Sequence, residues 1–113
     1  MINLKDKNII VTGASGGIGN SIVKKLNEAG ANILASGTKT EKLKELKNNF
    51  EKIKIMNFDI SKSEKIEEFI ENATKELGGN LDGIINNAGI TQDNLAIRMS
   101  YEEWQKVTDI NLT

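Results

Sequence analysis

A glycine-rich stretch at residues 12–19, Thr-Gly-Ala-Ser-Gly-Gly-Ile-Gly, most strongly limits how this chain folds. It follows an apolar run at residues 8–11 and opens a segment whose apolar residues recur at helical spacing from Ile18 to Leu26. The glycines therefore fall where a buried strand turns into a helix. The free N–H groups at the start of a helix attract anions, so a diphosphate is the expected ligand.

Each of three glycines has a predicted task at this turn. Gly13 lets the chain turn tightly off the strand, Gly17 removes a Cβ where a phosphate approaches the backbone, and Gly19 lets the helix pack closely on the sheet. The spacing differs from G-x-G-x-x-G, and no Gly-Lys-Ser/Thr follows, so the stretch is not a P-loop. On the glycines alone, a simple structural turn remains the alternative.

Length and composition limit the function classes. The chain has 113 residues, which suits one domain over residues 1–113, with 38% hydrophobic residues and a net charge of -1. No basic excess favours nucleic acid or a membrane surface, and residues 1–7 lack a signal-peptide pattern, so we expect a cytoplasmic protein. The sequence contains no cysteine and no histidine. This excludes a Ser-His-Asp triad and a cysteine zinc site, and we expect no metal.

Apolar strands alternate with helical patterns along the chain, which predicts an α/β fold with a parallel sheet and helices on both faces. The first helix is expected over residues 17–29. Capping boxes are expected at Thr38 with Glu41, at Ser61 with Glu64 and at Ser100 with Glu103. The expected strands are residues 8–11, 32–36, 53–58 and 81–86. The expected strand order is 3-2-1-4, half of a doubly wound sheet, with a crevice where residues 13–19 meet residues 86–89.

These motifs together resemble the short-chain dehydrogenase/reductase family, a Rossmann-like fold. The resemblance covers the whole chain and rests on residues 12–19, on Asp59-Ile60 after the third strand, on residues 86–89 and on Asn111. A narrower resemblance is to the subgroup of 3-oxoacyl-acyl-carrier-protein reductases of fatty-acid synthesis. It rests on residues 87–95, on Arg98-Met99 and on Glu103-Trp104. That resemblance implies reduction of 3-oxoacyl-acyl-carrier-protein to the 3-hydroxyacyl form.

The resemblance also implies roles for individual residues. Thr12 would tie the glycine turn to the loop after the fourth strand, and Asn86 would brace the strands. Asn111 matches the asparagine of the family's Asn-Ser-Tyr-Lys catalytic set, where it holds a water in the proton relay. The residues implied to bind the dinucleotide are Gly13, Ala14, Ser15, Gly16, Gly17, Ile18, Gly19, Thr38, Lys39, Asp59, Ile60, Asn87, Ala88 and Gly89.

Two features bear on the cofactor and on activity. The region after the second strand holds no acid to bind a ribose 2′-hydroxyl, whereas Thr38 and Lys39 suit a 2′-phosphate, so NADP(H) is favoured over NAD(H). The family's Ser and Tyr-x-x-x-Lys have no match, and the one tyrosine, Tyr101, is interpreted as structural or exposed. A truncated reductase, inactive alone, is therefore expected.

Two other readings stay open at this point. A homo-oligomer is expected through the strand-four edge or the last helix, because both are apolar and lack a partner. The alternative function is a non-catalytic, flavodoxin-like nucleotide-binding module or a self-assembling fragment.

Overall fold

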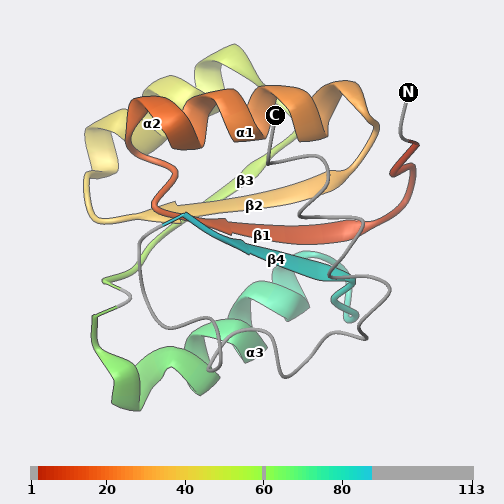
Figure 1. The fold of residues 1–113 in the computed structure, drawn as a ribbon. Helices are drawn as coiled ribbons and strands as arrows, with labels where there is room; N and C mark the ends of the chain where they lie inside the picture. The colour runs from red at the N-terminus through yellow and green to blue at the C-terminus, as the bar shows by residue number, and fades with distance from the viewer. Residues whose placement is uncertain (1–2, 60, 88–113) are drawn as a thin grey trace.

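The computed structural model describes residues 3–59 and 61–87, which form a sheet covered by helices on both faces (Figure 1). The strands are β1 (Asn8–Thr12), β2 (Asn32–Gly37), β3 (Lys54–Asn57) and β4 (Gly83–Asn86). Helices α1 (Gly17–Glu28) and α2 (Thr40–Asn49) lie on one face, and α3 (Ile66–Glu76), preceded by a 3₁₀ turn (Ser63–Lys65), lies on the other. None of these helices is long and apolar enough to cross a bilayer.

The sheet has the order β3-β2-β1-β4 with all pairs parallel, which confirms the predicted half of a doubly wound fold. The same order contradicts the flavodoxin-like alternative. In that fold the third strand pairs with the first, whereas here β3 pairs with β2 and β4 pairs with β1.

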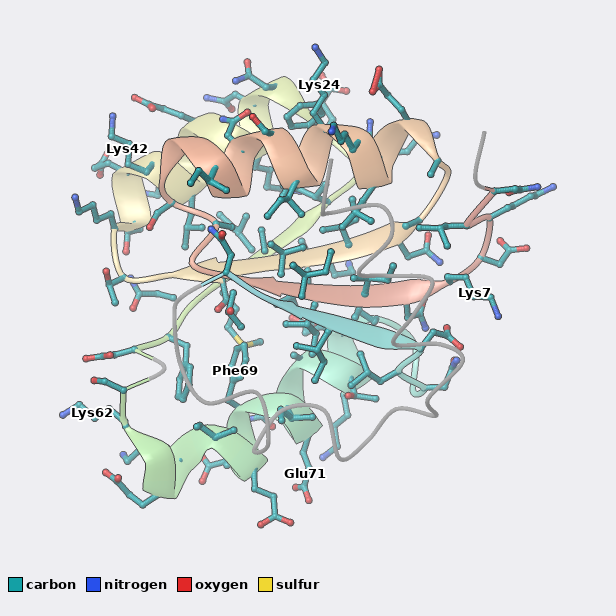
Figure 2. All side chains as sticks on the ribbon, viewed as in Figure 1. Lys7, Lys24, Lys42, Lys62, Phe69 and Glu71 are labelled. Carbon is teal, nitrogen blue, oxygen red and sulfur yellow. The ribbon has the colours of Figure 1, made fainter. Side chains whose placement is uncertain are left out.

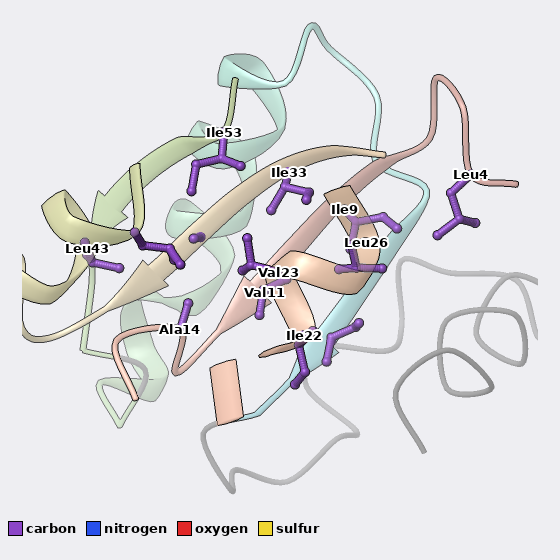
Figure 3. Packing of buried hydrophobic residues seen from close by; sticks show 13 residues of the cluster. Leu4, Ile9, Val11, Ala14, Ile22, Val23, Leu26, Ile33, Leu43 and Ile53 are labelled. Atoms are coloured by element: carbon purple, nitrogen blue, oxygen red, sulfur yellow. The ribbon is translucent and has the colours of Figure 1, made fainter. Parts of the chain in front are cut away.

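The core divides at the sheet because successive side chains of a strand point to opposite faces. From β1, Ile9 and Val11 join the cluster under α1 and α2 (Figure 3), while Ile10 joins the cluster under α3. Strands buried on both faces are continuously apolar, as parallel strands under crossover helices must be. On the α3 side, Phe58 stacks on Phe69 with ring centroids 4.2 Å apart.

The outward faces of the helices carry mostly polar side chains. Lys24 of α1, Lys42 of α2 and Glu71 of α3 point away from the sheet, whereas Phe69 points toward it (Figure 2). The Lys/Glu-rich faces of α2 and α3 are therefore solvated faces.

Helix α1 corrects one sequence prediction. Ile18 was expected on the buried stripe, but it is 71% exposed. The buried stripe begins instead at Gly19 and continues through Ile22, Val23 and Leu26. Successive helical residues are rotated by about 100°, so once Gly19 faces inward Ile18 is turned away from the core.

Two of the predicted capping boxes are wrong. Helix α2 begins at Thr40 rather than beside Thr38, and no side chain caps it at Lys39. Ser61 does not cap α3 because its hydroxyl donates to the Asp59 carboxylate. The third box, at Ser100 and Glu103, lies outside the described residues, as does the last predicted helix.

Candidate functional site: the carboxyl edge of the sheet

The turn from β1 into α1 has the geometry that its glycines predict. Gly13 has φ +63°, in the left-handed region that favours glycine. A Cβ added at Gly19 would lie 2.5 Å from the Ala14 Cα and 2.6 Å from the Gly13 carbonyl oxygen. Gly19 thus allows α1 to pack on the backbone of its own loop, rather than directly on the sheet as expected from the sequence.

Neither backbone conformation nor close packing within the described residues requires a glycine at two other positions of the loop, Gly16 and Gly17. A Cβ added at Gly16 or Gly17 would have no atom of residues 3–59 and 61–87 within 4 Å, and neither residue has a positive φ. The described part of the chain therefore leaves open space over this part of the backbone. A ligand that must approach the main chain closely would use that space.

The start of α1 is also electrostatically suited to an anion. No side chain of the described residues hydrogen-bonds to the helix start at Gly16, and the first turn carries no acidic residue. The Asn20 amide makes the first helical bond, to the Gly16 carbonyl at 3.0 Å. The preceding N–H groups and the positive end of the helix dipole therefore face outward, as in phosphate sites at helix starts.

The loop after β4 meets this glycine loop directly. The Asn87 amide donates to Thr12 Oγ1 at 3.1 Å, and Asn87 Nδ2 donates to the Gly13 carbonyl at 3.0 Å. Thr12 is fully buried, and its hydroxyl donates to the Ile85 carbonyl at 3.4 Å. The tie that the sequence assigned to Thr12 is therefore confirmed. The predicted residues Ile60, Ala88, Gly89 and Asn111 lie outside the described residues.

The end of β2 is the third segment that borders the candidate site, after the glycine loop and the loop after β4. The Ala14 amide donates to the Ser36 carbonyl at 2.8 Å. A Cβ at Gly37 would lie 2.7 Å from Ser15 Oγ and 3.2 Å from the Ser15 amide nitrogen, so the absence of a side chain at Gly37 favours the close approach of the two segments. The predicted phosphate-binding residues Thr38 and Lys39 follow and are both exposed.

Asp59 lies beyond β3 on the same edge and is exposed. Its Oδ1 accepts hydrogen bonds from Ser61 Oγ at 2.7 Å and from the Ser61 amide at 3.0 Å. These two bonds, with a smaller contribution from the positive charge of Lys62, hold the pKa of the Asp59 carboxyl below its usual range. The carboxylate is therefore ionised and held in one orientation near neutral pH.

Sequence reasoning missed Asn57 and Ser61, which hold neighbouring parts of this edge. Asn57 Nδ2 donates to the Thr38 carbonyl and to Thr40 Oγ1, and Ser61 orients Asp59. Asn57 ends β3 and Ser61 follows it closely, and this position was the available signal, because strand ends at this edge line the crevice in doubly wound folds.

A hollow of about 510 Å³ lies elsewhere, between the last turns of α1 and α2, with Asn27, Gly30, Asn48 and Phe50 among its lining residues. It does not include any predicted site residue. Within residues 3–59 and 61–87 no group of three acidic, His or Cys side chains is placed to hold a metal.

Comparison with protein families matches residues 7–113 to the short chain dehydrogenase family. The chain therefore belongs to the short-chain dehydrogenases, the class that the sheet order and the glycine loop indicated. It is 44% identical over 116 residues to a 3-oxoacyl-[acyl-carrier-protein] reductase from Rickettsia felis, covering 99% of this chain and 45% of that relative. It is 38% identical over 114 residues to nodulation protein G of a Rhizobium species, covering 100% of this chain and 46% of the relative.

Solved structures agree with this assignment. A metagenomic short-chain oxidoreductase crystallised with NADP is similar with a TM-score of 0.70 and 31% identity, over 77% of this chain and 41% of that one. A short-chain dehydrogenase/reductase from Brucella melitensis is similar with a TM-score of 0.69 and 28% identity, over 99% of this chain and 48% of that one. The chain thus spans about half the length of the relatives that it matches.

Proposed function

We propose that this chain binds NADP(H) at the carboxyl edge of its sheet, as the dinucleotide-binding half of an oxidoreductase similar to 3-oxoacyl-[acyl-carrier-protein] reductases. The observation that carries the proposal is the union of the glycine loop with the loop after β4 through Thr12 and Asn87. Beside this union lie an uncapped helix start and open space over Gly16 and Gly17. Family membership and the NADP-bound structural neighbour support the cofactor.

In this proposal the described residues bind and orient the cofactor. The diphosphate lies on the amides at the start of α1, over Gly16 and Gly17. Thr38 and Lys39 receive the 2′-phosphate, because a hydroxyl donor and an ammonium group both favour phosphate oxygens. Asp59 accepts from the exocyclic amine of adenine. When bound, the cofactor supplies or accepts a hydride.

The roles of Ile60, Ala88 and Gly89 around adenine and ribose, and of Asn111 in holding a water, remain proposals by resemblance. Ketone reduction also needs a proton donor at the carbonyl oxygen, and a tyrosine whose pKa is lowered by a nearby lysine fills that role. The single tyrosine, Tyr101, is followed four residues later by Gln105 rather than by lysine. We therefore propose that the 113-residue chain binds the cofactor without reducing a 3-oxoacyl thioester.

The proposal is tested by calorimetric titration of the chain with NADPH and NADH, together with an assay on an acetoacetyl thioester. We expect NADPH binding without turnover. The informative variant is Gly17→Ala, whose methyl group occupies the open space and displaces phosphate from its amide donors. Charge-assisted hydrogen bonds make this loss worth about tenfold or more in affinity.

Ser21→Ala, on the exposed side of α1, is the matched control and should bind NADPH like the wild type. Equal affinity of Gly17→Ala and wild type would refute the placement of the diphosphate. Turnover by the chain alone would refute its inactivity.

The acyl-carrier-protein thioester is proposed as the substrate of the complete enzyme, on the strength of the reductases that the chain resembles. Self-association through the β4 edge or residues 100–113, and the cytoplasmic location, also remain predictions. Light scattering over a range of protein concentrations measures the first, and a stable monomer at high concentration would contradict it.

A further inference from the structure

Asn57, the last residue of β3, makes two hydrogen bonds that join distant parts of the chain. Its Nδ2 donates to the Thr38 carbonyl oxygen at 3.1 Å and to Thr40 Oγ1 at 2.7 Å. The next residue, Phe58, donates its amide to the Gly37 carbonyl at 3.0 Å. The end of β3 therefore holds the connection from β2 to α2 through both side chain and main chain.

This connection has few other restraints. Gly37 is buried against Ser15, but the three residues that follow it are exposed. Lys39 is extended, with φ −101° and ψ 93°, and no side chain within residues 3–59 and 61–87 caps the helix that starts after it. In the part of the chain that the structure describes, Asn57 is the side chain that hydrogen-bonds to residues 38–40.

The Asn57 bonds also set the direction of the Thr40 hydroxyl. Because Thr40 Oγ1 accepts a hydrogen from Asn57, its own O–H hydrogen remains to donate to another group. The Thr38 carbonyl is likewise occupied by Asn57. The Thr38 carbonyl oxygen, which would repel a phosphate, is therefore held in a hydrogen bond to Asn57. The Thr40 hydroxyl keeps its hydrogen available to donate to a phosphate oxygen.

We propose that Asn57 is a positioning residue for cofactor selectivity, holding residues 38–40 in the conformation that receives the 2′-phosphate of NADP(H). The inference rests on the proposed function, since it concerns the same site. It predicts an effect confined to the 2′ group, because Asn57 does not hold the glycine loop or Asn87.

The experiment compares NADPH and NADH binding by calorimetry for wild type, Asn57→Ala and Asn57→Asp. NADPH and NADH differ only in the 2′-phosphate, so the ratio of their Kd values reports on that group alone. Partial loss of folding weakens both equally and leaves the ratio unchanged.

Asn57→Ala removes both donors. We expect the NADPH preference to fall by about fivefold to tenfold, the size expected for one to two neutral hydrogen bonds, with NADH affinity within about twofold of wild type. Asn57→Asp keeps the shape but replaces the donor by an anion, so we expect a larger fall and a preference for NADH. Asn48→Ala, an exposed residue on α2, is the matched control and should keep the wild-type ratio.

The outcomes separate the two proposals. Wild-type binding of NADPH with an unchanged Kd ratio in Asn57→Ala would overturn the role of Asn57 and leave the proposed function standing. If the wild-type chain binds neither nucleotide, the proposed function and the inference fail together. If Asn57→Ala and Asn57→Asp each lose affinity for NADPH but not for NADH, the proposed function and the role of Asn57 are both supported.

Discussion

At the amino end of the sheet, Asn8, Asn32, Asn80 and Asp82 bond to one another. Among the described residues, the carboxyl end leaves the Ser36 hydroxyl and the start of α1 without such bonds. Asn8 is buried, its Nδ2 donates to the Asn80 carbonyl at 2.8 Å, and its Oδ1 accepts from Asn32 Nδ2 at 3.0 Å. The Asn8 amide donates to Asp82 Oδ2 at 2.8 Å.

The carboxyl end also carries small and polar residues, but there the described residues leave a helix start uncapped and backbone uncovered. No described side chain caps the start of α1, and a Cβ at Gly16 or Gly17 would contact no atom in the described part of the chain. Ser36 Oγ is buried without a hydrogen-bond partner among the described residues. Thr74 Oγ1 in the last turn of α3 is also buried without a partner among the described residues, so an unpaired hydroxyl alone does not mark a ligand site. The open space over Gly16 and Gly17 and the uncapped start of α1 are what make the carboxyl end the candidate ligand site.

The largest expected effect distinguishes two glycines of the carboxyl end. Gly19→Ala places a methyl group against the backbone of Gly13 and Ala14. We expect the free energy of unfolding to fall by about 3 kcal/mol, as for severe overpacking, with loss of NADPH binding. Urea unfolding followed by circular dichroism measures the free energy of unfolding.

The Gly17→Ala variant is the comparison, and it should change the free energy of unfolding by no more than about 1 kcal/mol. Equal destabilisation by both variants would contradict this assignment.

The next effect concerns the amino end. Asn8→Ala removes a buried amide that donates to the Asn80 carbonyl and accepts from Asn32, so two hydrogen bonds are lost. We expect a loss of about 2 kcal/mol in the free energy of unfolding, with the Kd for NADPH unchanged among folded molecules. Asn72→Ala, exposed on α3, is the control. A weaker NADPH affinity in folded Asn8→Ala would show that the two ends are not independent.

A smaller effect is expected where the two carboxyl-end loops join. Thr12→Val preserves the shape of the side chain but removes the oxygen that accepts from the Asn87 amide. We expect a loss of about 1 kcal/mol in the free energy of unfolding, accompanied by weaker NADPH binding, because Asn87 is no longer fixed beside Gly13. Unfolding curves and calorimetry on the same samples test this. If Thr12→Val lowers the free energy of unfolding without changing the affinity for NADPH, Thr12 has a structural role alone.

The smallest effect is a change in titration. Ser61→Ala removes the strongest cause of the lowered Asp59 pKa, so the Asp59 pKa should rise toward its ordinary value. A carboxyl with a depressed folded-state pKa stabilises the fold above the unfolded pKa of about 3.9, and this contribution is lost as the pH falls through the folded pKa. Asp59 is exposed, so the change in stability should be slight. Carboxyl chemical shifts followed by NMR from pH 2 to 7 measure the pKa, and an unchanged value would refute the Ser61 contact.

The sheet and the glycine loop were predictable because their signals are local. Apolar runs identify the strands, and the left-handed turn at Gly13 needs a residue without a Cβ. The contact between Thr12 and Asn87 followed from the resemblance and from the meeting of parallel strand ends at one edge. The exposure of Ile18 was not predictable from periodicity, because the inward position of Gly19 depends on close contact with Ala14.

The capping boxes failed for a related reason. A Thr or Ser three residues before Glu satisfies the local pattern, but competing bonds decide the outcome. Asn57, from a neighbouring strand, holds Thr38 and Thr40, and Asp59 accepts from the Ser61 hydroxyl. The residues that orient the candidate site thus depend on tertiary contacts, which a one-dimensional pattern does not contain.

The central place of β1 has a consequence for synthesis on the ribosome. β1 is made before its neighbour β4, and the bonded residues Asn8 and Asp82 are 74 positions apart. At about 5–20 residues per second, one side of β1 waits roughly 4–15 seconds for its neighbour to be translated. During that interval the nascent chain exposes an apolar strand to chaperones and to competing strands, so the order of translation, as well as equilibrium stability, governs the yield of folded protein.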